Sequence, residues 1–122
     1  MSRTILAVDD SPTMLQTISI VLENAGHTVV TAKNGEDALE KLKSGNKFHA
    51  ILTDINMPSM DGITLTGEIR KLPSFRFTPI IILTTESGMQ RKDEGKKAGA
   101  TGWIVKPFKP EQLVEVIRKV CP

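Results

Sequence analysis

The stretch Pro79-Ile80-Ile81-Ile82-Leu83, followed by Thr84, decides the fold. It is short and continuously apolar, without the alternation of a half-exposed strand, which is typical of a parallel strand buried on both faces by helices. Three other runs have the same form and also end at polar residues: Thr4 to Val8 before Asp9 and Asp10, Ala50 to Thr53 before Asp54, and Gly102 to Val105 before Lys106. In open parallel sheets the ligand site lies beyond the carboxyl ends of the strands, so we expect these polar residues to share one rim.

Helix patterns separate the apolar runs, and a fifth strand is expected over Thr28 to Ala32. Together they predict a doubly wound α/β domain in which strand and helix alternate five times. The helices are expected at these positions: from Pro12, capped by Ser11, to Gly26, with an apolar face that includes Ile18, Leu22 and Ala25; from Asn34-Gly35 to Ser44-Gly45; from Gly62 to Leu72; from Gly88 to Ala98; and from Pro110 to Val120. The Gly88 helix has Gly95 in its interior and Met89 as its one large apolar residue, so we expect it to be the most mobile.

Length and composition favour one soluble domain over residues 1–122. No segment is apolar enough to cross a membrane, and the start of the chain does not resemble a signal peptide, so a cytoplasmic protein is expected. The net charge of +2 does not favour nucleic acid as a partner. The single cysteine, Cys121, excludes an internal disulfide and is expected to be a surface thiol.

Asp9, Asp10 and Asp54 are the candidate metal ligands. Taken alone, Asp9 and Asp10 are better explained as turn residues that cap the Pro12 helix than as metal ligands. A further carboxylate at the end of another strand changes that balance, because crowded carboxylates repel and a bound cation compensates. Oxygen ligands without a Cys or His cluster favour Mg²⁺ or Mn²⁺, and His27 and His49 are expected at the surface.

Four segments in this order resemble the receiver domain of bacterial two-component response regulators, and the likeness extends over the whole chain. They are Val8-Asp9-Asp10-Ser11, Asp54-Ile55-Asn56-Met57-Pro58-Ser59-Met60-Asp61-Gly62, Leu83-Thr84-Thr85-Glu86 and Val105-Lys106-Pro107-Phe108. The length and the segment from Gly99 to Phe108 are most similar to stand-alone chemotaxis regulators of the CheY type. The resemblance implies the flavodoxin-like (βα)5 fold with parallel strand order 2-1-3-4-5.

The resemblance also implies roles for the rim residues. Asp54 would be the phosphoacceptor that attacks the phosphohistidine of a partner histidine kinase, forming 4-aspartylphosphate. Asp10, Asp54 and the carbonyl of Asn56 would hold Mg²⁺, with Asp9 assisting through water. Lys106 would pair with a phosphoryl oxygen, and Thr84 would donate to another oxygen and act as the switch. This fits phosphoryl transfer, which needs positioning and charge neutralisation more than a base.

Further expectations follow from the same likeness. The Lys-Pro peptide bond at this position is cis in the family, and the isomer of Lys106-Pro107 is left open here. Asn56 and Glu86 would tune how fast water removes the phosphoryl group. Trp103 stands where the family usually has Tyr or Phe, as the aromatic that turns inward when the threonine moves. A partly exposed indole on an edge strand is the expectation here, and whether it turns inward is left open.

Function is expected to be phosphorylation-controlled signalling, not catalysis on an external substrate. The leading target is the flagellar motor switch in chemotaxis, and the alternative is a phosphorelay intermediate or a phosphate sink for a shared kinase. The expected protein is a monomer whose partners are a chemotaxis-type kinase, that target and a candidate phosphatase, with no nucleic acid or membrane.

Two other classes fit the sequence less well. A phosphatase of the haloacid-dehalogenase type would need its aspartates two positions apart, whereas Asp9 and Asp10 are adjacent. It would also need a cap domain, for which 122 residues leave no room. A flavin carrier of the same fold would have its phosphate repelled by the same two carboxylates.

Overall fold

Five parallel strands form the centre of the computed structural model, which describes residues 3–85 and 90–121. The strand and helix bounds, in chain order, are β1 (Thr4–Val8), α1 (Pro12–Asn24), β2 (Thr28–Ala32), α2 (Gly35–Lys43), β3 (Ala50–Asp54), α3 (Gly62–Arg70), a short 3-10 turn η1 (Pro73–Phe75), β4 (Ile80–Thr84), α4 (Lys92–Ala98), β5 (Gly102–Val105) and α5 (Pro110–Val120). The predicted alternation of strand and helix is confirmed.

The strand order is β2-β1-β3-β4-β5, as the resemblance implied. β1 and β3 are neighbours at the centre of the sheet, with Val8 level with Thr53, so Asp9 and Asp54 extend from adjacent strands. β4 and β5 follow on the other side of β3, and Thr84 pairs with Val105, the residue before Lys106. The register therefore brings all the predicted rim residues to one edge of the sheet.

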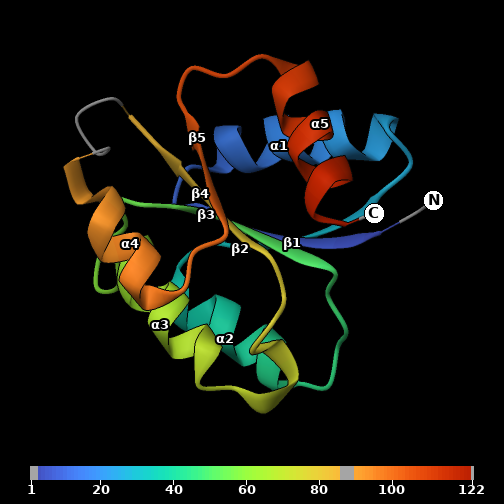
Figure 1. Cartoon of the computed structure of the whole chain (residues 1–122). Coiled ribbons are helices and arrows are strands. Elements are labelled where there is room, and N and C mark those ends of the chain that lie inside the picture. Colours follow the sequence, from blue (N-terminus) through green and yellow to red (C-terminus); the bar gives the residue numbers. More distant parts are fainter. Residues whose placement is uncertain (1–2, 86–89, 122) are drawn as a thin grey trace.

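Helices cover both faces of the sheet: α1 and α5 lie on one side, and α2, α3 and α4 on the other (Figure 1). The side chains of β1 alternate between the two layers, because successive residues of a strand point to opposite faces. Ile5 and Ala7 pack with Ile18 of α1 and Ile117 of α5, whereas Leu6 packs in the layer under α2 and α3. Both faces of β1, β3 and β4 are therefore dry, which explains why their sequences do not alternate.

Helix boundaries follow the predicted caps with small differences. The Ser11 side chain accepts a hydrogen bond from the Met14 N–H and starts α1 as predicted. Ala25, predicted on the buried face, is exposed, because it is already the C-cap of this helix. α3 ends at Arg70 and not at Leu72, because the chain then turns into the 3-10 segment that begins at Pro73.

The Arg70 side chain ties the end of α3 to the end of α4. Its guanidinium donates to the carbonyl oxygens of Phe75, Thr78 and Gly99 at 2.6–3.1 Å. Gly99 is the left-handed C-cap of α4, with φ of 111°. Burial lowers the pKa of Arg70, and the carbonyl oxygens replace the water that its guanidinium loses.

The helix predicted over Gly88 to Ala98 is shorter in the structure. α4 begins at Lys92, and residues 86–89, which include Met89, lie outside the described residues. Gly95 is the buried residue of this helix. The expectation that this helix is the most mobile stays a prediction. None of the described helices is long and apolar enough to cross a membrane.

Candidate functional site

Three carboxylates meet at the carboxyl end of the sheet, as the sequence predicted. One oxygen from each of Asp9, Asp10 and Asp54 lies within 4.8 Å of the others. Asp9 and Asp54 are almost fully buried, with 1% and 6% of their surfaces exposed, whereas Asp10 is exposed. Although Asp9 and Asp10 are adjacent in sequence, both reach this cluster because the chain turns directly after β1. Mutual repulsion makes the cluster unfavourable unless cations balance it.

Lys106 supplies one of these cations. Its Nζ lies 2.6 Å from Oδ1 of Asp54 and 3.8 Å from Oδ2 of Asp9. The ammonium thus contacts two of the three carboxylates and is only one-fifth exposed. The Lys106-Pro107 peptide bond is cis, which settles a point that the sequence left open. One lysine leaves a net negative charge among four groups.

The Asp9 carboxylate is buried and only partly satisfied by hydrogen bonds in the part of the chain that the structure describes. Its Oδ1 accepts a hydrogen bond from the backbone N–H of Ser11, but its buried Oδ2 has no hydrogen-bond partner among the described residues. Burial raises the pKa of Asp9, and the charges of Asp54 and Asp10 add to that rise, against the Ser11 hydrogen bond and the Lys106 charge. The hydrogen bond from Ser11 shows that Asp9 also acts as a turn residue. That role occupies only Oδ1 and does not explain why Oδ2 is buried without a hydrogen bond from the described residues.

The cluster has the chemistry of a magnesium site. Its ligands are hard carboxylate oxygens. Among the described residues the buried Oδ2 of Asp9 accepts no hydrogen bond and has only a 3.8 Å ion pair with Lys106, so it is a group that a divalent cation would satisfy. Asn56 follows in the loop after β3 and is exposed. The implied role of its carbonyl as a fourth ligand stays a prediction.

Close packing fixes the loop that follows Asp54. A Cβ at Gly62 would lie 2.3 Å from the Asp54 carbonyl oxygen, so only glycine fits here, and the Gly62 N–H donates to the Ile55 carbonyl at 2.9 Å. Met60 covers Gly35 at the start of α2, where a Cβ would lie 2.7 Å from the methionine sulfur. The loop between Asp54 and α3 is therefore held at both ends.

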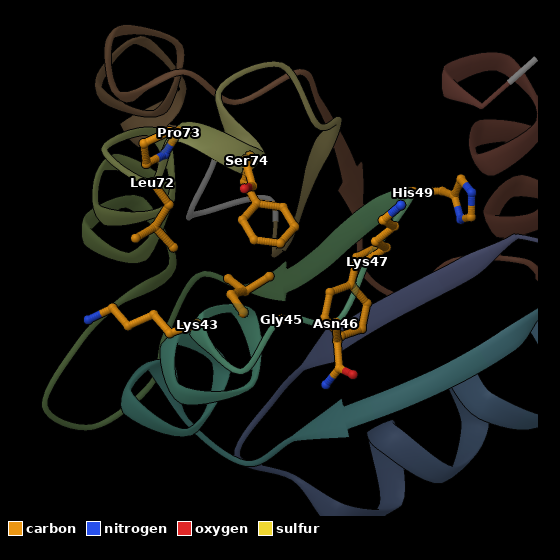
Figure 2. Close-up of a pocket in the computed structure, with 11 residues that line it drawn as sticks. Lys43, Gly45, Asn46, Lys47, His49, Leu72, Pro73 and Ser74 are labelled. Carbon is orange, nitrogen blue, oxygen red and sulfur yellow. The ribbon is translucent and has the colours of Figure 1, made fainter.

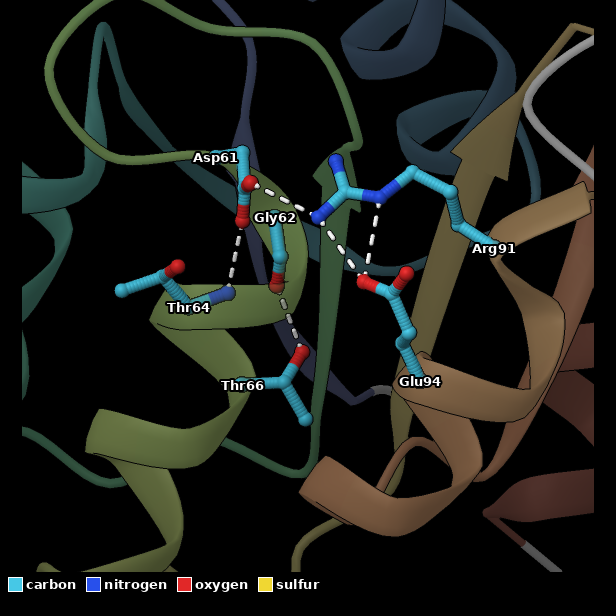
Figure 3. Close-up of polar contacts among 6 residues, drawn as sticks. All are labelled: Asp61, Gly62, Thr64, Thr66, Arg91 and Glu94. Atoms are coloured by element: carbon cyan, nitrogen blue, oxygen red, sulfur yellow. Dashed lines mark hydrogen bonds and ion pairs between the residues drawn. The ribbon is translucent and has the colours of Figure 1, made fainter.

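Arg91 links this loop to α4 (Figure 3). Asp61 caps α3 by accepting a 2.7 Å hydrogen bond from the Thr64 N–H, and its other oxygen lies 3.1 Å from an Arg91 nitrogen. Arg91 also pairs with Glu94 at 3.1 Å. Burial raises the pKa of Asp61, but the hydrogen bonds from Thr64 and Arg91 outweigh it and hold that pKa below its ordinary value.

The sequence did not predict this link between α3 and α4. An aspartate directly before a helix is a standard capping signal, so the cap at Asp61 could have been predicted. Its ion pair with Arg91 could not, because the two residues are 30 positions apart.

Thr84 ends β4 and is fully buried. Its hydroxyl donates to the carbonyl of Thr85 at 3.2 Å, and its own carbonyl accepts from the Lys106 N–H. The backbone of the proposed switch residue is therefore bonded directly to that of the site lysine. Glu86, expected to tune dephosphorylation, lies outside the described residues, and that role stays a prediction.

Trp103 lies on β5 beside β4 and is partly buried, as predicted. It packs against a small core cluster of Ile55, Ile63 and Ile82, under α4. A Cβ at Gly95 would lie 2.4 Å from Cζ2 of the indole. The glycine that makes α4 a poor helix in sequence terms is therefore the residue that lets it lie over this ring.

Comparison with known proteins agrees with this geometry. Residues 5–118 match the response regulator receiver domain family. The chain belongs to that family. The receiver assignment is thereby confirmed, and it replaces the phosphatase and flavin-carrier alternatives.

Curated relatives of this receiver include chemotaxis proteins. It is 39% identical over 117 residues to the chemotaxis protein CheY1 of Helicobacter pylori, covering 95% of this chain and 94% of the relative. It is 40% identical over 116 residues to the sensor histidine kinase CheAY of the same organism, covering 94% of this chain but only 14% of that protein. The second match is therefore to a small part of a much larger kinase.

Solved receiver structures superpose on it closely. The chemotaxis response regulator CheY4 of Vibrio cholerae is 43% identical, with a TM-score of 0.92 over 98% of this chain and 99% of that one. The receiver domain of sensor histidine kinase PA1611 from Pseudomonas aeruginosa is 29% identical, with a TM-score of 0.90 over 99% of this chain and 98% of that one. That structure has a magnesium ion coordinated in its active site cleft.

Proposed function

We propose that this receiver takes a phosphoryl group onto Asp54 from a phosphohistidine of a partner histidine kinase, in a magnesium-dependent reaction. One observation carries the proposal: the buried Asp54 carboxylate lies 2.6 Å from the Lys106 ammonium and within 4.8 Å of Asp9 and Asp10 oxygens. A nucleophilic carboxylate, a cation and a set of oxygen ligands thus surround one small volume. Those are the parts that phosphoryl transfer uses.

In the proposed step an Asp54 carboxylate oxygen attacks the phosphorus in line with the leaving imidazole. The new P–O bond forms as the P–N bond breaks, and the imidazole keeps the electron pair and takes a proton from solvent. Lys106, which balances the free carboxylate, is close enough to move its ammonium onto a phosphoryl oxygen. No general base is needed, because the nucleophile is a carboxylate oxygen and not a hydroxyl group.

Asp9, Asp10 and Asp54 are the residues that would hold Mg²⁺, together with the Asn56 carbonyl. The ion would neutralise charge that develops on the phosphoryl oxygens. Asp9 fits this role because its Oδ2 is buried and accepts no hydrogen bond from the described residues. Its attachment to the Ser11 N–H keeps that oxygen directed into the cluster.

The proposed switch starts at Thr84. Its hydroxyl would exchange the Thr85 carbonyl for a phosphoryl oxygen, and β5 would follow through the contact between Thr84 and Lys106. Trp103 and α4 lie next to this path. The downstream surface that changes is therefore proposed to include α4, β5 and α5.

A direct test is phosphorylation by acetyl phosphate, followed by mass spectrometry of the intact protein and its peptides. We expect one phosphoryl group on Asp54 that requires Mg²⁺, and none in Asp54→Asn, because an amide is not a nucleophile. Asp93→Asn, at an exposed aspartate of α4, is the matched control and should be modified like the wild type. A phosphoryl group on another residue of the wild type would refute the assignment.

We further propose that the kinase is of the chemotaxis type and that the target is the flagellar motor switch. The names of the relatives support this, since one is a chemotaxis protein of similar length and another is a kinase with a matching segment. A phosphorelay intermediate or a phosphate sink would use the same chemistry with another partner. Capture of partners on beryllofluoride-activated protein distinguishes them: a motor switch protein supports the first role, and a phosphotransfer protein or the kinase alone supports the second.

The remaining proposals concern how the protein works in the cell. We propose a cytoplasmic monomer that catalyses only its own phosphorylation and dephosphorylation, with a phosphatase as a further partner. Asn56 and Glu86 are proposed to set the rate at which water reaches the phosphoryl group. Substitution of Asn56 should change the lifetime of the phosphorylated state without preventing its formation.

A further inference from the structure

A groove of about 690 Å³ opens at the end of the sheet opposite to Asp54. One wall is the end of α2 and the segment that leads into β3, and the other is the segment from Leu72 to Phe75 that leads toward β4. Figure 2 shows Leu72, Pro73 and Ser74 on one of these segments and Asn46 and Lys47 on the other, and all five line the groove. Since these residues precede β3 and β4, whereas Asp54 and Thr84 end them, the groove and the site are separated by the length of the strands.

The inner surface of the groove is apolar and firmly held. Leu42, Phe48, Leu72 and Phe75 line it, and the Phe48 and Phe75 rings lie 6.4 Å apart at an angle of 42°. The Phe75 N–H donates to the Leu72 carbonyl, and the Phe75 carbonyl accepts from Arg70. The groove is therefore built by residues that the fold already fixes, as expected of a preformed binding site.

The two segments around the groove are basic and contain no carboxylate. Residues 41–49 and 70–77 include six cations and no Asp or Glu: Lys41, Lys43, Lys47, Arg70, Lys71 and Arg76. Lys41 pairs with Asp37, Lys71 pairs with Glu68, and Arg70 binds carbonyl oxygens. In the described part of the chain, Lys43, Lys47 and Arg76 are exposed and form no ion pair. The net charge of the whole chain is only +2, so these three unpaired cations make the surroundings of the groove more positive than the chain as a whole.

An exposed aromatic residue follows the groove wall. Phe77 is 90% exposed, and the Arg76 guanidinium lies over its ring at 5.7 Å. Aromatic and arginine residues are enriched at the centres of protein interfaces, so this pair suits a contact surface. Phe77 is two positions beyond Phe75, which lines the groove.

We propose that this groove docks an acidic peptide segment of a partner protein that carries a bulky apolar anchor residue. The anchor enters between Phe48 and Leu72, and flanking carboxylates pair with Lys43 and Lys47. Arg76 and Phe77 extend the contact along the peptide. The apolar lining favours a peptide over a nucleic acid, whose phosphates would meet the same cations but would leave that lining uncovered.

We expect docking in this groove to depend little on the phosphorylation state, although Arg70 binds both the Phe75 carbonyl of the groove wall and the Gly99 carbonyl at the end of α4. The groove lies at the far end of the strands from Asp54, and its walls are held by contacts that do not involve Thr84 or Lys106. The groove would therefore recruit a partner constitutively, while the rim controls what the recruited complex does. Failure of this proposal would leave the receiver chemistry untouched.

Fluorescence anisotropy with a labelled acidic dodecapeptide that has a central Leu-Phe pair tests the proposal. We expect micromolar binding that weakens about tenfold in a Lys43→Glu/Lys47→Glu double variant. The charge-matched Lys33→Glu/Lys119→Glu double variant changes two exposed lysines outside the groove and should bind within about twofold of wild type. A peptide with Ser-Ser in place of Leu-Phe should bind about tenfold more weakly, because the anchor is lost.

Amide shift mapping locates the complex. Peptide-induced shifts should fall on residues 42–49 and 72–77, and beryllofluoride with Mg²⁺ should leave the affinity unchanged within about twofold. Three results would overturn the proposal: no binding of the dodecapeptide, equal weakening by both lysine pairs, or shifts centred on the rim or on α4. Equally tight binding of a charge-matched oligonucleotide would also overturn it, since the site would then recognise charge alone.

Discussion

The Trp103 indole occupies the space that a side chain at position 95 would need. A Cβ built on Gly95 would lie 2.4 Å from Cζ2 and 2.5 Å from Cη2 of the ring, and 3.5 Å from the Ile82 Cδ1. β5 and α4 are thus fitted together at one glycine, beside the core cluster that begins at Ile55. Any rearrangement of the indole and any shift of α4 must therefore occur together.

Gly95→Ala should destabilise the protein despite the better helix propensity of alanine. Propensity favours Ala by about 1 kcal/mol, but overpacking against the ring costs about 1–3 kcal/mol. We expect a net loss of about 1 kcal/mol in the free energy of unfolding, measured by urea denaturation. Gly67→Ala is the control, because a Cβ there meets nothing within 4 Å, and it should stabilise α3. Equal stabilisation by both variants would show that α4 does not rest on the indole.

Activation should change the environment of Trp103, which is the only tryptophan in the chain. Beryllofluoride, standing in for the phosphoryl group on Asp54, should draw the Thr84 hydroxyl away from the Thr85 carbonyl. The space left behind, or the accompanying shift of α4, should alter the emission wavelength or the quencher access of the indole. Thr84→Ala should reduce this response and leave Mg²⁺ binding intact. Identical emission and quenching with and without beryllofluoride would make Trp103 a static packing residue.

Magnesium should stabilise the folded protein. An ion that binds only the folded state at about 100 times its Kd adds about 2.7 kcal/mol to the free energy of unfolding. The melting temperature should then rise by about 10 °C, at roughly 4 °C per kcal/mol. Asp9→Asn should raise the stability of the metal-free protein, because it removes a buried, poorly compensated charge while its amide oxygen can still accept from Ser11. The same variant should lose most of the magnesium response. If the melting temperature of the wild type does not change as Mg²⁺ is added, the shared metal site is refuted.

Lys106→Arg should separate phosphorylation from signalling. The ammonium sits 2.6 Å from Asp54 and 3.8 Å from Asp9, a space into which a planar guanidinium does not fit in the same way. We expect residual phosphorylation of Asp54 but a reduced Trp103 response to beryllofluoride. Lys106→Met, which removes the charge, should slow phosphorylation by about 100-fold. A normal Trp103 response in Lys106→Arg would mean that positive charge alone suffices for the switch.

The Asp61 contacts should contribute stability that depends on pH. Because the folded-state pKa of Asp61 is lower than its ordinary value near 3.8, its contribution is present above that value and is lost as the pH falls through the folded-state pKa. Asp61→Asn keeps a capping oxygen but removes the charge that pairs with Arg91. The wild type should therefore be more stable than this variant at neutral pH, and the difference should disappear in acid. Urea midpoints measured at a series of pH values test this, and a difference that does not change with pH would contradict it.

The sequence alone was enough to predict the sheet and the shared rim of polar residues. Parallel strands buried on both faces must be continuously apolar, so Ile80 to Leu83 could be read without knowledge of their neighbours. Polar residues that follow such strands necessarily meet at one edge, which is why the pattern of the chain is sufficient to bring Asp9, Asp54 and Lys106 together. The cap at Ser11 was equally local.

Only the tertiary structure decided how distant segments fit each other. That Gly95 makes room for Trp103, that Arg91 pairs with Asp61, and that Arg70 binds carbonyl oxygens near the end of α4 all depend on packing between elements far apart in the chain. Gly95 shows the reason most clearly. Helix propensity is a property of the isolated segment and marks this glycine as a weakness, whereas the packed protein uses its missing side chain as the space for an aromatic ring.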